Sequence, residues 1–133
     1  MRAAVFQGAG KPLVIETIAD PEPKPHQLLL KVHHCGICGS DLHMTETHSI
    51  SQLPAGSVMG HEFSGEIVEV GSALKGQFKE GQRVAGFPYI RCGECEACRR
   101  GDTTFGACTA AVGIGLGQHH GAYAELVTIG GHG

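Results

Sequence analysis

The chain has 133 residues, of which 41% are apolar and 17% charged, the usual proportions of a soluble globular protein with one domain. Its formal net charge of −3 and sequence pI near 6.3 exclude the strongly basic composition of a typical nucleic-acid-binding domain. With 21 glycines, 5% aromatic residues and no tryptophan, the composition predicts short strands joined by tight turns, and therefore a mainly β fold.

The sequence carries no sign of export or of membrane insertion. Its first residues lack a basic segment followed by an apolar run, so we expect no signal peptide and a cytoplasmic location. The longest uncharged stretch, 103–124, is long enough to cross a bilayer, but glycines, a glutamine and two histidines interrupt it. We interpret this stretch as loop and strand, and expect neither a membrane nor a nucleic acid as partner. In a reducing compartment the 6 cysteines favour metal binding over disulfides.

The N-terminal part predicts a hairpin, a stiff connector and a central strand. Residues 2–6 and 13–18 are expected to form two strands of a hairpin, because glycines and a proline separate them. Alternate prolines at 21, 23 and 25 then predict an extended connector, since each fixes its own φ and disfavours helix in the residue before it. Segment 28–33 is rich in consecutive apolar residues and favours a strand that is buried on both faces, and hence a central one.

A short helix is expected next, in the segment Cys35-Gly-Ile-Cys38-Gly-Ser40-Asp41-Leu-His43. Ser40 and Asp41 can cap this helix, which would then present Cys38 from its first turn. The polar segment 49–58 contains a proline and a glycine and predicts a loop that contacts a substrate.

Three more strands complete the prediction. Segment 62–70 mixes polar and apolar residues and indicates a half-buried strand that begins beside His61. After a turn at 79–81, a strand over 83–87 should end at Pro88. The last strand is expected over 123–129, after a glycine-rich turn at 113–117. The glycine spacing of that turn does not fit a dinucleotide-binding motif, and no helix is expected to follow it.

Cys38 and His61 are candidate ligands of a catalytic zinc ion. Zinc prefers thiolate and imidazole, and a catalytic zinc takes three protein ligands, which leaves its fourth position for water or substrate. Groups that orient ligands and move protons stand beside them in the sequence, namely Ser40, Asp41, His43 and Glu62. Two alternatives stay open: the cysteine and histidine could be buried for packing alone, and the two carboxylates could be cap and turn residues.

Four closely spaced cysteines form a second candidate metal site, in a lobe of about residues 91–109. They are Cys92, Cys95, Cys98 and Cys108. A zinc site of four cysteines offers no position to substrate and is therefore structural. Two disulfides or an iron–sulfur cluster are the alternatives. Residues 99–101 predict the end of a short helical turn within this lobe, with Gly101 where a glycine closes a helix.

Taken as a set, these motifs resemble the N-terminal catalytic domain of zinc-dependent medium-chain alcohol dehydrogenases. The resemblance covers nearly the whole chain and rests on the order and spacing of several motifs: Gly36-Ile-Cys38-Gly-Ser40-Asp41-Leu-His43, Gly60-His61-Glu62, Gly65-Glu-Ile-Val-Glu-Val-Gly71, Phe78-Lys-Glu-Gly81-Gln-Arg83-Val84, the four cysteines and Gly121-Ala-Tyr-Ala124-Glu125. It implies a GroES-like fold over residues 1–133, a partly open β-barrel with short helices and a projecting zinc lobe. The implied reaction is reversible hydride transfer between an alcohol and NAD or NADP, in which zinc acts as a Lewis acid that lowers the pKa of the alcohol.

The resemblance also implies metal ligands and partners. Cys38 and His61 match two ligands of the catalytic zinc, and the four cysteines of the lobe match those of a structural zinc. Glu62 matches a glutamate that can approach the catalytic metal during ligand exchange, and in some members a carboxylate near this position is itself a ligand. The implied partner is a small-molecule alcohol or carbonyl compound, and the whole protein is expected to be a homo-oligomer, either a dimer or a tetramer.

Three further residues acquire roles from the same resemblance. Ser40 matches the hydroxyl that contacts the alcohol, and His43 matches the end of the proton relay. Asp41 matches the carboxylate that holds the zinc-ligating histidine from behind.

The chain departs from the pattern of the family at a few positions. The gap from Cys98 to Cys108 is about two residues longer than is common in the family. Cys35 replaces a small or aliphatic residue, and we expect a buried thiol there without a ligand role. Four histidines match no ligand position and are expected to lie at the surface or to be hydrogen-bonded: His33, His34, His119 and His120.

The nucleotide-binding domain of the family, and the third ligand of its catalytic zinc, normally lie beyond residue 133. We therefore expect this chain alone to be inactive. A non-catalytic binding module stabilised by zinc is the main alternative function. The zinc-free quinone reductase branch of the same superfamily does not fit, because it lacks Cys38, the Gly60-His61-Glu62 motif and the cysteine lobe.

Overall fold

Short strands dominate the structure, a computed structural model that describes residues 1–49 and 53–131. The described elements in chain order are β1 (Arg2–Val5), β2 (Val14–Thr17), β3 (Gln27–Cys35), α1 (Gly39–Thr45), β4 (Phe63–Val70), the 3₁₀ turn η1 (Ser72–Leu74), β5 (Arg83–Ala85), β6 (Tyr89–Ile90), α2 (Glu96–Arg99), β7 (Val112–Gly113) and β8 (Leu126–Gly130). Strands hold more of the described chain than helices do, so the predicted mainly β class is confirmed.

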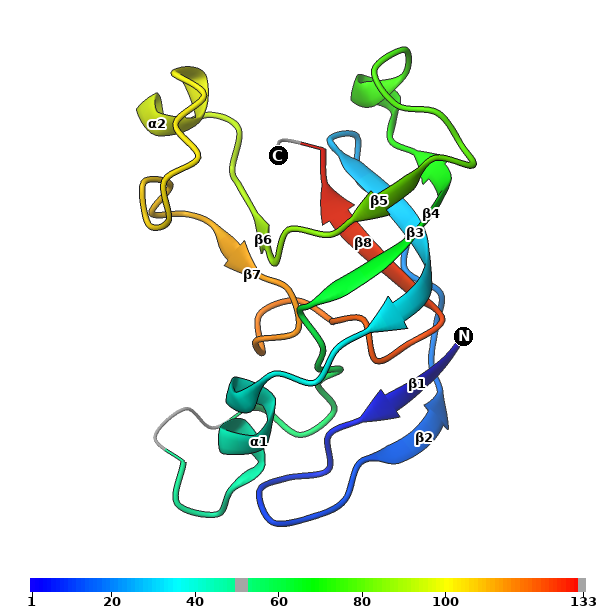
Figure 1. Ribbon diagram of the computed structural model, residues 1–133, viewed down its shortest axis with the longest axis vertical. Coiled ribbons are helices and arrows are strands. Elements are labelled where there is room, and N and C mark those ends of the chain that lie inside the picture. The colour runs from blue at the N-terminus through cyan, green and yellow to red at the C-terminus, as the bar shows by residue number, and fades with distance from the viewer. Residues whose placement is uncertain (50–52, 132–133) are drawn as a thin grey trace.

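A four-stranded antiparallel sheet, in the order β5-β4-β3-β8, forms the centre of the molecule (Figure 1). As predicted, the strand with the consecutive apolar residues, β3, lies inside the sheet, between β4 and β8. Its Leu28 and Leu30 side chains are at most 1% exposed. Strand β4 alternates buried and partly exposed residues in its first half, as expected of a half-buried strand. The core cluster packed on this sheet consists of Leu28, Leu30, Phe63, Ile67, Leu74, Ile114, Ala122, Val127 and Ile129.

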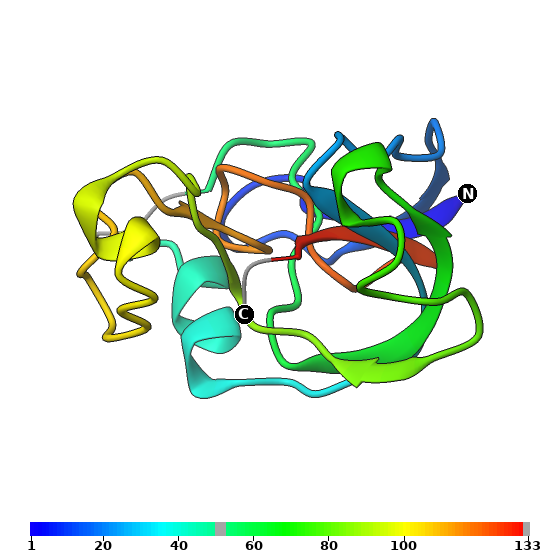
Figure 2. The ribbon, with the colours of Figure 1, turned by 90° about the horizontal axis from the view of Figure 1, so that it is seen from above.

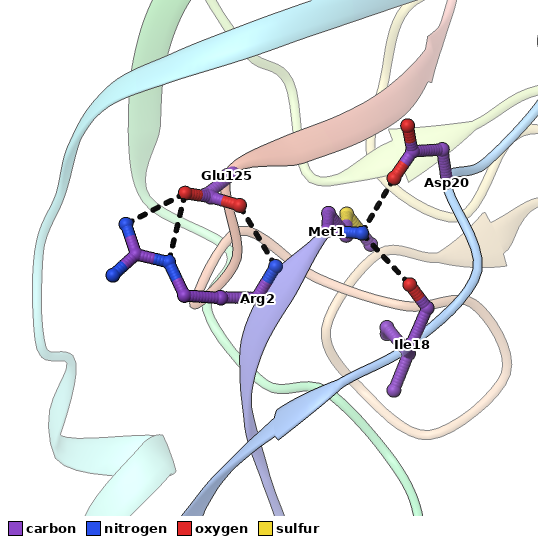
Figure 3. Close-up of polar contacts among 5 residues, drawn as sticks. All are labelled: Met1, Arg2, Ile18, Asp20 and Glu125. Carbon is purple, nitrogen blue, oxygen red and sulfur yellow. Dashed lines mark hydrogen bonds and ion pairs between the residues drawn. The ribbon is translucent and has the colours of Figure 1, made fainter.

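Strands β1 and β2 form the predicted antiparallel hairpin, which is fastened to the rest of the chain at its open end (Figure 3). The amino group of Met1 donates to the Ile18 carbonyl at 2.8 Å and pairs with the Asp20 carboxylate at 2.5 Å. The Arg2 guanidinium donates twice to Glu125 Oε1, at 2.7 and 3.0 Å, while the Arg2 backbone N–H donates to Oε2 at 2.8 Å. Glu125, part of a family motif, therefore ties β1 to the segment that leads into β8.

The lobe that carries the four cysteines projects away from the four-stranded sheet, as the two ribbon views show (Figures 1 and 2). It is joined to the rest of the chain through the two-stranded β6–β7 ladder. Helix α2 spans a single turn, and Gly101 follows its C-cap residue with φ of +69°. This left-handed conformation is the one that a glycine adopts at low cost, so the predicted helix end at 99–101 is confirmed.

The structure departs from the expected element boundaries in several places. Strand β8 begins at Leu126 and not at 123, because the preceding backbone pairs elsewhere: the N–H of Tyr123 donates to the Met59 carbonyl and the N–H of Ala4 donates to the Tyr123 carbonyl. Strand β5 ends at Ala85, before 87. The two-residue strands β6 and β7 and the turn η1 were not predicted. Residues 50–52 of the expected loop 49–58 lie outside the described residues.

Among the described residues, no helix reaches the length and apolarity that a membrane crossing requires.

Candidate functional site

Cys38 stands at the start of helix α1, where the chain leaves β3. Its backbone is extended, with φ of −86° and ψ of 155°, and its N–H donates to Asp41 Oδ2 at 2.9 Å. The helix therefore begins two residues earlier than a cap at Ser40 would place it: Cys38 is the N-cap residue, and Asp41 supports the cap from the third helical position. We had expected Ser40 and Asp41 to be the cap themselves. The earlier start places Cys38 at the N-terminus of the helix.

A tight turn at Gly60 brings the side chain of His61 close to that of Cys38. Gly60 has φ of +95°, and a Cβ atom there would lie 2.8 Å from both the Cys35 sulfur and the Tyr123 ring. Only glycine fits, which explains why this residue precedes the histidine. The ligand atoms of Cys38, His61 and Glu62 lie within 4.8 Å of one another, so one ion could contact all three.

Asp41 lies behind the His61 imidazole. Asp41 Oδ1 is 3.4 Å from His61 Nδ1, and the two side chains are 3% and 12% exposed. Neither atom has a hydrogen bond of good geometry in the structure. A carboxylate can only accept, so it favours the tautomer with hydrogen on Nδ1 and leaves the Nε2 lone pair available. Ser40 Oγ lies 3.2 Å from that Nε2 atom, on the opposite side of the ring.

Sequence reasoning missed Tyr123 as a member of this site. The Tyr123 hydroxyl donates to Asp41 Oδ2 at 2.9 Å and also lies 3.3 Å from the Gly36 carbonyl oxygen. Burial, and then the hydrogen bond with the Asp41 carboxylate, raise the pKa of Tyr123 well above its ordinary value. The hydroxyl therefore stays protonated and remains a donor. Its only signal in the sequence was its place in the Gly121-to-Glu125 motif.

The other predicted site residue, His43, lies one helical turn after Ser40 on α1. Its side chain is 78% exposed, and its Nδ1 atom lies 3.6 Å from Glu46 Oε2. Residues three apart share a helix face, which is the arrangement that a proton relay to solvent requires. The structure does not group His43 with the candidate zinc ligands.

Cys35 and three of the remaining histidines have other partners. Cys35 is half-buried against the core, where burial, followed by the nearby Asp41 charge, raises the pKa of its thiol to about 11. His119 Nε2 lies 2.8 Å from Thr128 Oγ1, and His120 Nδ1 accepts the Val58 N–H at 3.2 Å. His33 lies 4.0 Å from Glu66.

The four cysteines of the lobe converge as a zinc site requires. All six cysteines of the chain lie in the described part and are free thiols. The sulfurs of the lobe lie within 4.8 Å of one another; Cys92 is 3.6 Å from Cys108 and 3.9 Å from Cys98. A Zn–S distance of about 2.3 Å places the sulfurs of a tetrahedral site about 3.8 Å apart, whereas a disulfide needs about 2.05 Å. The residues present therefore fit one zinc ion, and Cys108 belongs to the set despite its longer spacing.

Backbone donors prepare at least one of these thiols for metal binding. Hydrogen bonds from the N–H groups of Glu94 and Cys95 lower the pKa of Cys92 to about 6. Thiolate is the form that binds metal, so these donors favour the ligand state near neutral pH.

Comparison of the sequence with known protein families identifies the family of this chain. The profile of the alcohol dehydrogenase GroES-like domain matches residues 24–132, which is most of the chain. The chain belongs to this family. The GroES-like fold that the motifs implied is thereby confirmed, together with the predicted membership of the alcohol dehydrogenase family.

Individual relatives agree with this assignment. The chain is 38% identical over 131 residues to an L-threonine 3-dehydrogenase of Xanthomonas campestris pv. campestris, covering 97% of this chain and 37% of that protein. The solved alcohol dehydrogenase TADH from Thermus sp. ATN1 is 34% identical with a TM-score of 0.84, and the match covers 98% of this chain and 38% of that one. A solved NAD-dependent alcohol dehydrogenase is 30% identical with a TM-score of 0.81, over 98% and 37% of the two chains. This GroES-like domain thus spans little more than a third of the length of the relatives that it matches.

Proposed function

We propose that residues 1–133 form the catalytic domain of a zinc-dependent alcohol dehydrogenase, which transfers hydride reversibly between an alcohol and NAD or NADP. The observation that carries the proposal is the convergence of Cys38, His61 and Glu62 in front of the buried Asp41 carboxylate. The names of the similar proteins support the same chemistry, because they include threonine, butanediol and galactitol-1-phosphate dehydrogenases, and each of these named compounds carries a hydroxyl group.

Cys38 and His61 would hold the catalytic zinc, and the carboxylate of Glu62 is the third candidate ligand within reach. When bound, zinc supplies Lewis-acid polarisation of the alcohol oxygen, which lowers the pKa of the alcohol. Asp41 keeps the proton of His61 on Nδ1, so that Nε2 faces outward as a neutral ligand. The buried position of this pair excludes water from the back of the imidazole.

The hydroxyl of Ser40 and the imidazole of His43 would move the proton that the alcohol loses. Ser40 Oγ already faces the ligand side of His61, at 3.2 Å from Nε2. His43 follows one turn later on α1 and is open to solvent, to which it could release the proton. The loop at 49–58 is our candidate for substrate contacts.

The four-cysteine lobe would hold a second, structural zinc, because its sulfurs leave no open position for a substrate. A nicotinamide cofactor needs another domain. Every strand pair of the described elements is antiparallel, so these elements contain no βαβ unit of the kind that binds dinucleotides.

Counting zinc tests the proposal. The chain is dialysed against micromolar free zinc, and bound metal is measured by mass spectrometry of the native protein. We expect two zinc ions per chain, one lost in Cys38→Ser and the other in Cys95→Ser. Cys35→Ser is the matched control and should retain both. A parent chain that binds one zinc, with Cys38→Ser unchanged, would instead support a zinc-stabilised binding module without catalytic function.

A further inference from the structure

The backbone of Tyr123 is firmly placed behind the candidate catalytic site. Its N–H donates to the Met59 carbonyl at 2.9 Å, and its carbonyl accepts the Ala4 N–H at 2.8 Å. Its ring lies against Gly60, where any side chain would meet it. Three parts of the fold therefore meet at this tyrosine: the segment just before His61, the N-terminal hairpin and the segment that leads into β8. Together they set the position of its hydroxyl.

The Tyr123 hydroxyl and the backbone at the start of α1 donate hydrogen bonds to the same oxygen atom of Asp41. Asp41 Oδ2 accepts the Tyr123 hydroxyl and the Cys38 N–H, both at 2.9 Å. Two donors on one oxygen, one of them from a side chain 82 residues away in the sequence, oppose rotation of the carboxylate. Rotation is the motion that matters, because it would turn the other oxygen, Oδ1, away from His61 Nδ1.

We propose that Tyr123 is a positioning residue for the candidate catalytic zinc: its hydroxyl locks the Asp41 carboxylate, which holds His61 in the Nδ1–H tautomer and leaves Nε2 to the metal. The inference rests on the proposed function. It assigns Tyr123 no contact with substrate or cofactor, and it makes the hydroxyl group, not the ring, the part that matters.

The substitution Tyr123→Phe isolates the hydroxyl, because it keeps the ring that packs against Gly60. The chain offers a matched control, since its only other tyrosine is Tyr89. The Tyr89 ring contacts Phe87 and Phe105 near the four-cysteine lobe, so Tyr89→Phe removes the same group from another part of the fold.

The first measurement reads the tautomer of His61 without a metal at that site. The chain is loaded with one equivalent of zinc, which we expect to fill the tighter four-cysteine site, and long-range ¹H–¹⁵N correlation spectra are recorded. The imidazole signals that disappear in the spectrum of the His61→Gln variant are thereby assigned to His61. We expect the Nδ1–H tautomer to dominate in the parent chain and in Tyr89→Phe, and a mixture of both tautomers in Tyr123→Phe.

The second measurement is the zinc affinity of the Cys38–His61 site, by competition with a chromophoric chelator. Loss of an outer partner of a metal-ligating histidine typically weakens binding about 10–100-fold, and we expect Tyr123→Phe to lie near the lower end, about tenfold. Tyr89→Phe should bind as the parent does. In an Asp41→Asn background, Tyr123→Phe should change the affinity less than about twofold, because the group through which it acts is already lost.

Two results would overturn the inference while leaving the proposed function intact: an unchanged tautomer and affinity in Tyr123→Phe, or the same tenfold loss when Asp41 is already asparagine. The second would mean that the hydroxyl acts by another route. A parent chain that takes up no second zinc contradicts the proposed function itself, and the inference falls with it.

Discussion

Asp41 Oδ1 and His61 Nδ1 face each other across 3.4 Å in the interior, and neither atom has another polar partner of good geometry among the described residues. We infer that the pair orients the imidazole, because the carboxylate can only accept and therefore favours hydrogen on Nδ1. We predict that Asp41→Asn, which keeps the shape but removes the charge, weakens zinc binding at the Cys38–His61 site about 10–100-fold. Chelator competition measures this affinity.

The four-cysteine site serves as an internal reference for this substitution, since its affinity should not change. Glu69→Gln is the matched control, because it removes the charge of an exposed carboxylate on β4. Equal weakening at both metal sites would show that Asp41→Asn acts through general loss of structure, contrary to the prediction.

The cysteine lobe should depend on its metal for its structure. Binding of a structural zinc contributes an apparent 10–16 kcal/mol, roughly as much as the whole stability of about 5–15 kcal/mol of a typical domain. We predict that Cys95→Ser loses this zinc and unfolds at least the lobe, seen as lost hydrogen-exchange protection around α2 and a lower melting temperature. Cys35→Ser should behave as the parent chain does. Parental zinc content and melting temperature in Cys95→Ser would rule out the structural zinc.

The raised pKa of Tyr123 predicts a loss of stability at alkaline pH. In the unfolded chain this hydroxyl ionises near its ordinary pKa of 10.0, whereas burial and the Asp41 carboxylate raise the pKa in the folded chain. The folded state thus holds the proton more tightly, so this contribution to stability is complete below pH 10 and is lost as pH rises further. We expect the melting temperature to fall less steeply above pH 10 in Tyr123→Phe than in the parent. Tyr89→Phe should keep the parental slope, and equal slopes in all three proteins would contradict the assignment.

Much of the site could be predicted from the sequence because its signals are local. Cys38 and His61 stand in short motifs whose residue types already indicate metal binding, and the four cysteines are closely spaced. Strand β3 was recognisable from consecutive apolar residues, which only a central strand buries on both faces. These features depend on neighbouring residues and not on how distant segments meet.

The features that the sequence did not reveal depend on long-range packing. The contact of Tyr123 with Asp41 joins residues 82 positions apart, and it exists because the segment before β8 first pairs with residue 59 and with β1. Strands β6 and β7 have two residues each, too few to show an alternating pattern. The cap at Cys38 was missed because cysteine is not among the usual N-cap residues; the Asp41 carboxylate supports it by accepting the Cys38 N–H.

We predict that this chain alone does not oxidise alcohols. Hydride transfer needs the nicotinamide within about 3–3.5 Å of the reacting carbon, and holding two reactants at that distance supplies much of the rate. Calorimetric titration with NAD(H) and NADP(H) and an alcohol oxidation assay check this, with the similar solved NAD-dependent alcohol dehydrogenase as the positive control. Micromolar cofactor binding or turnover by residues 1–133 would contradict the prediction.

The most direct test of the account is to locate zinc by anomalous scattering at the zinc edge, in crystals of this chain grown with excess zinc. We predict two peaks, a full one among the sulfurs of Cys92, Cys95, Cys98 and Cys108, and a second one between Cys38 Sγ and His61 Nε2. The second should be weaker, because that site has fewer certain ligands. A peak at the lobe alone, with none between Cys38 and His61 under saturating zinc, would contradict the claim that this domain carries a catalytic metal site.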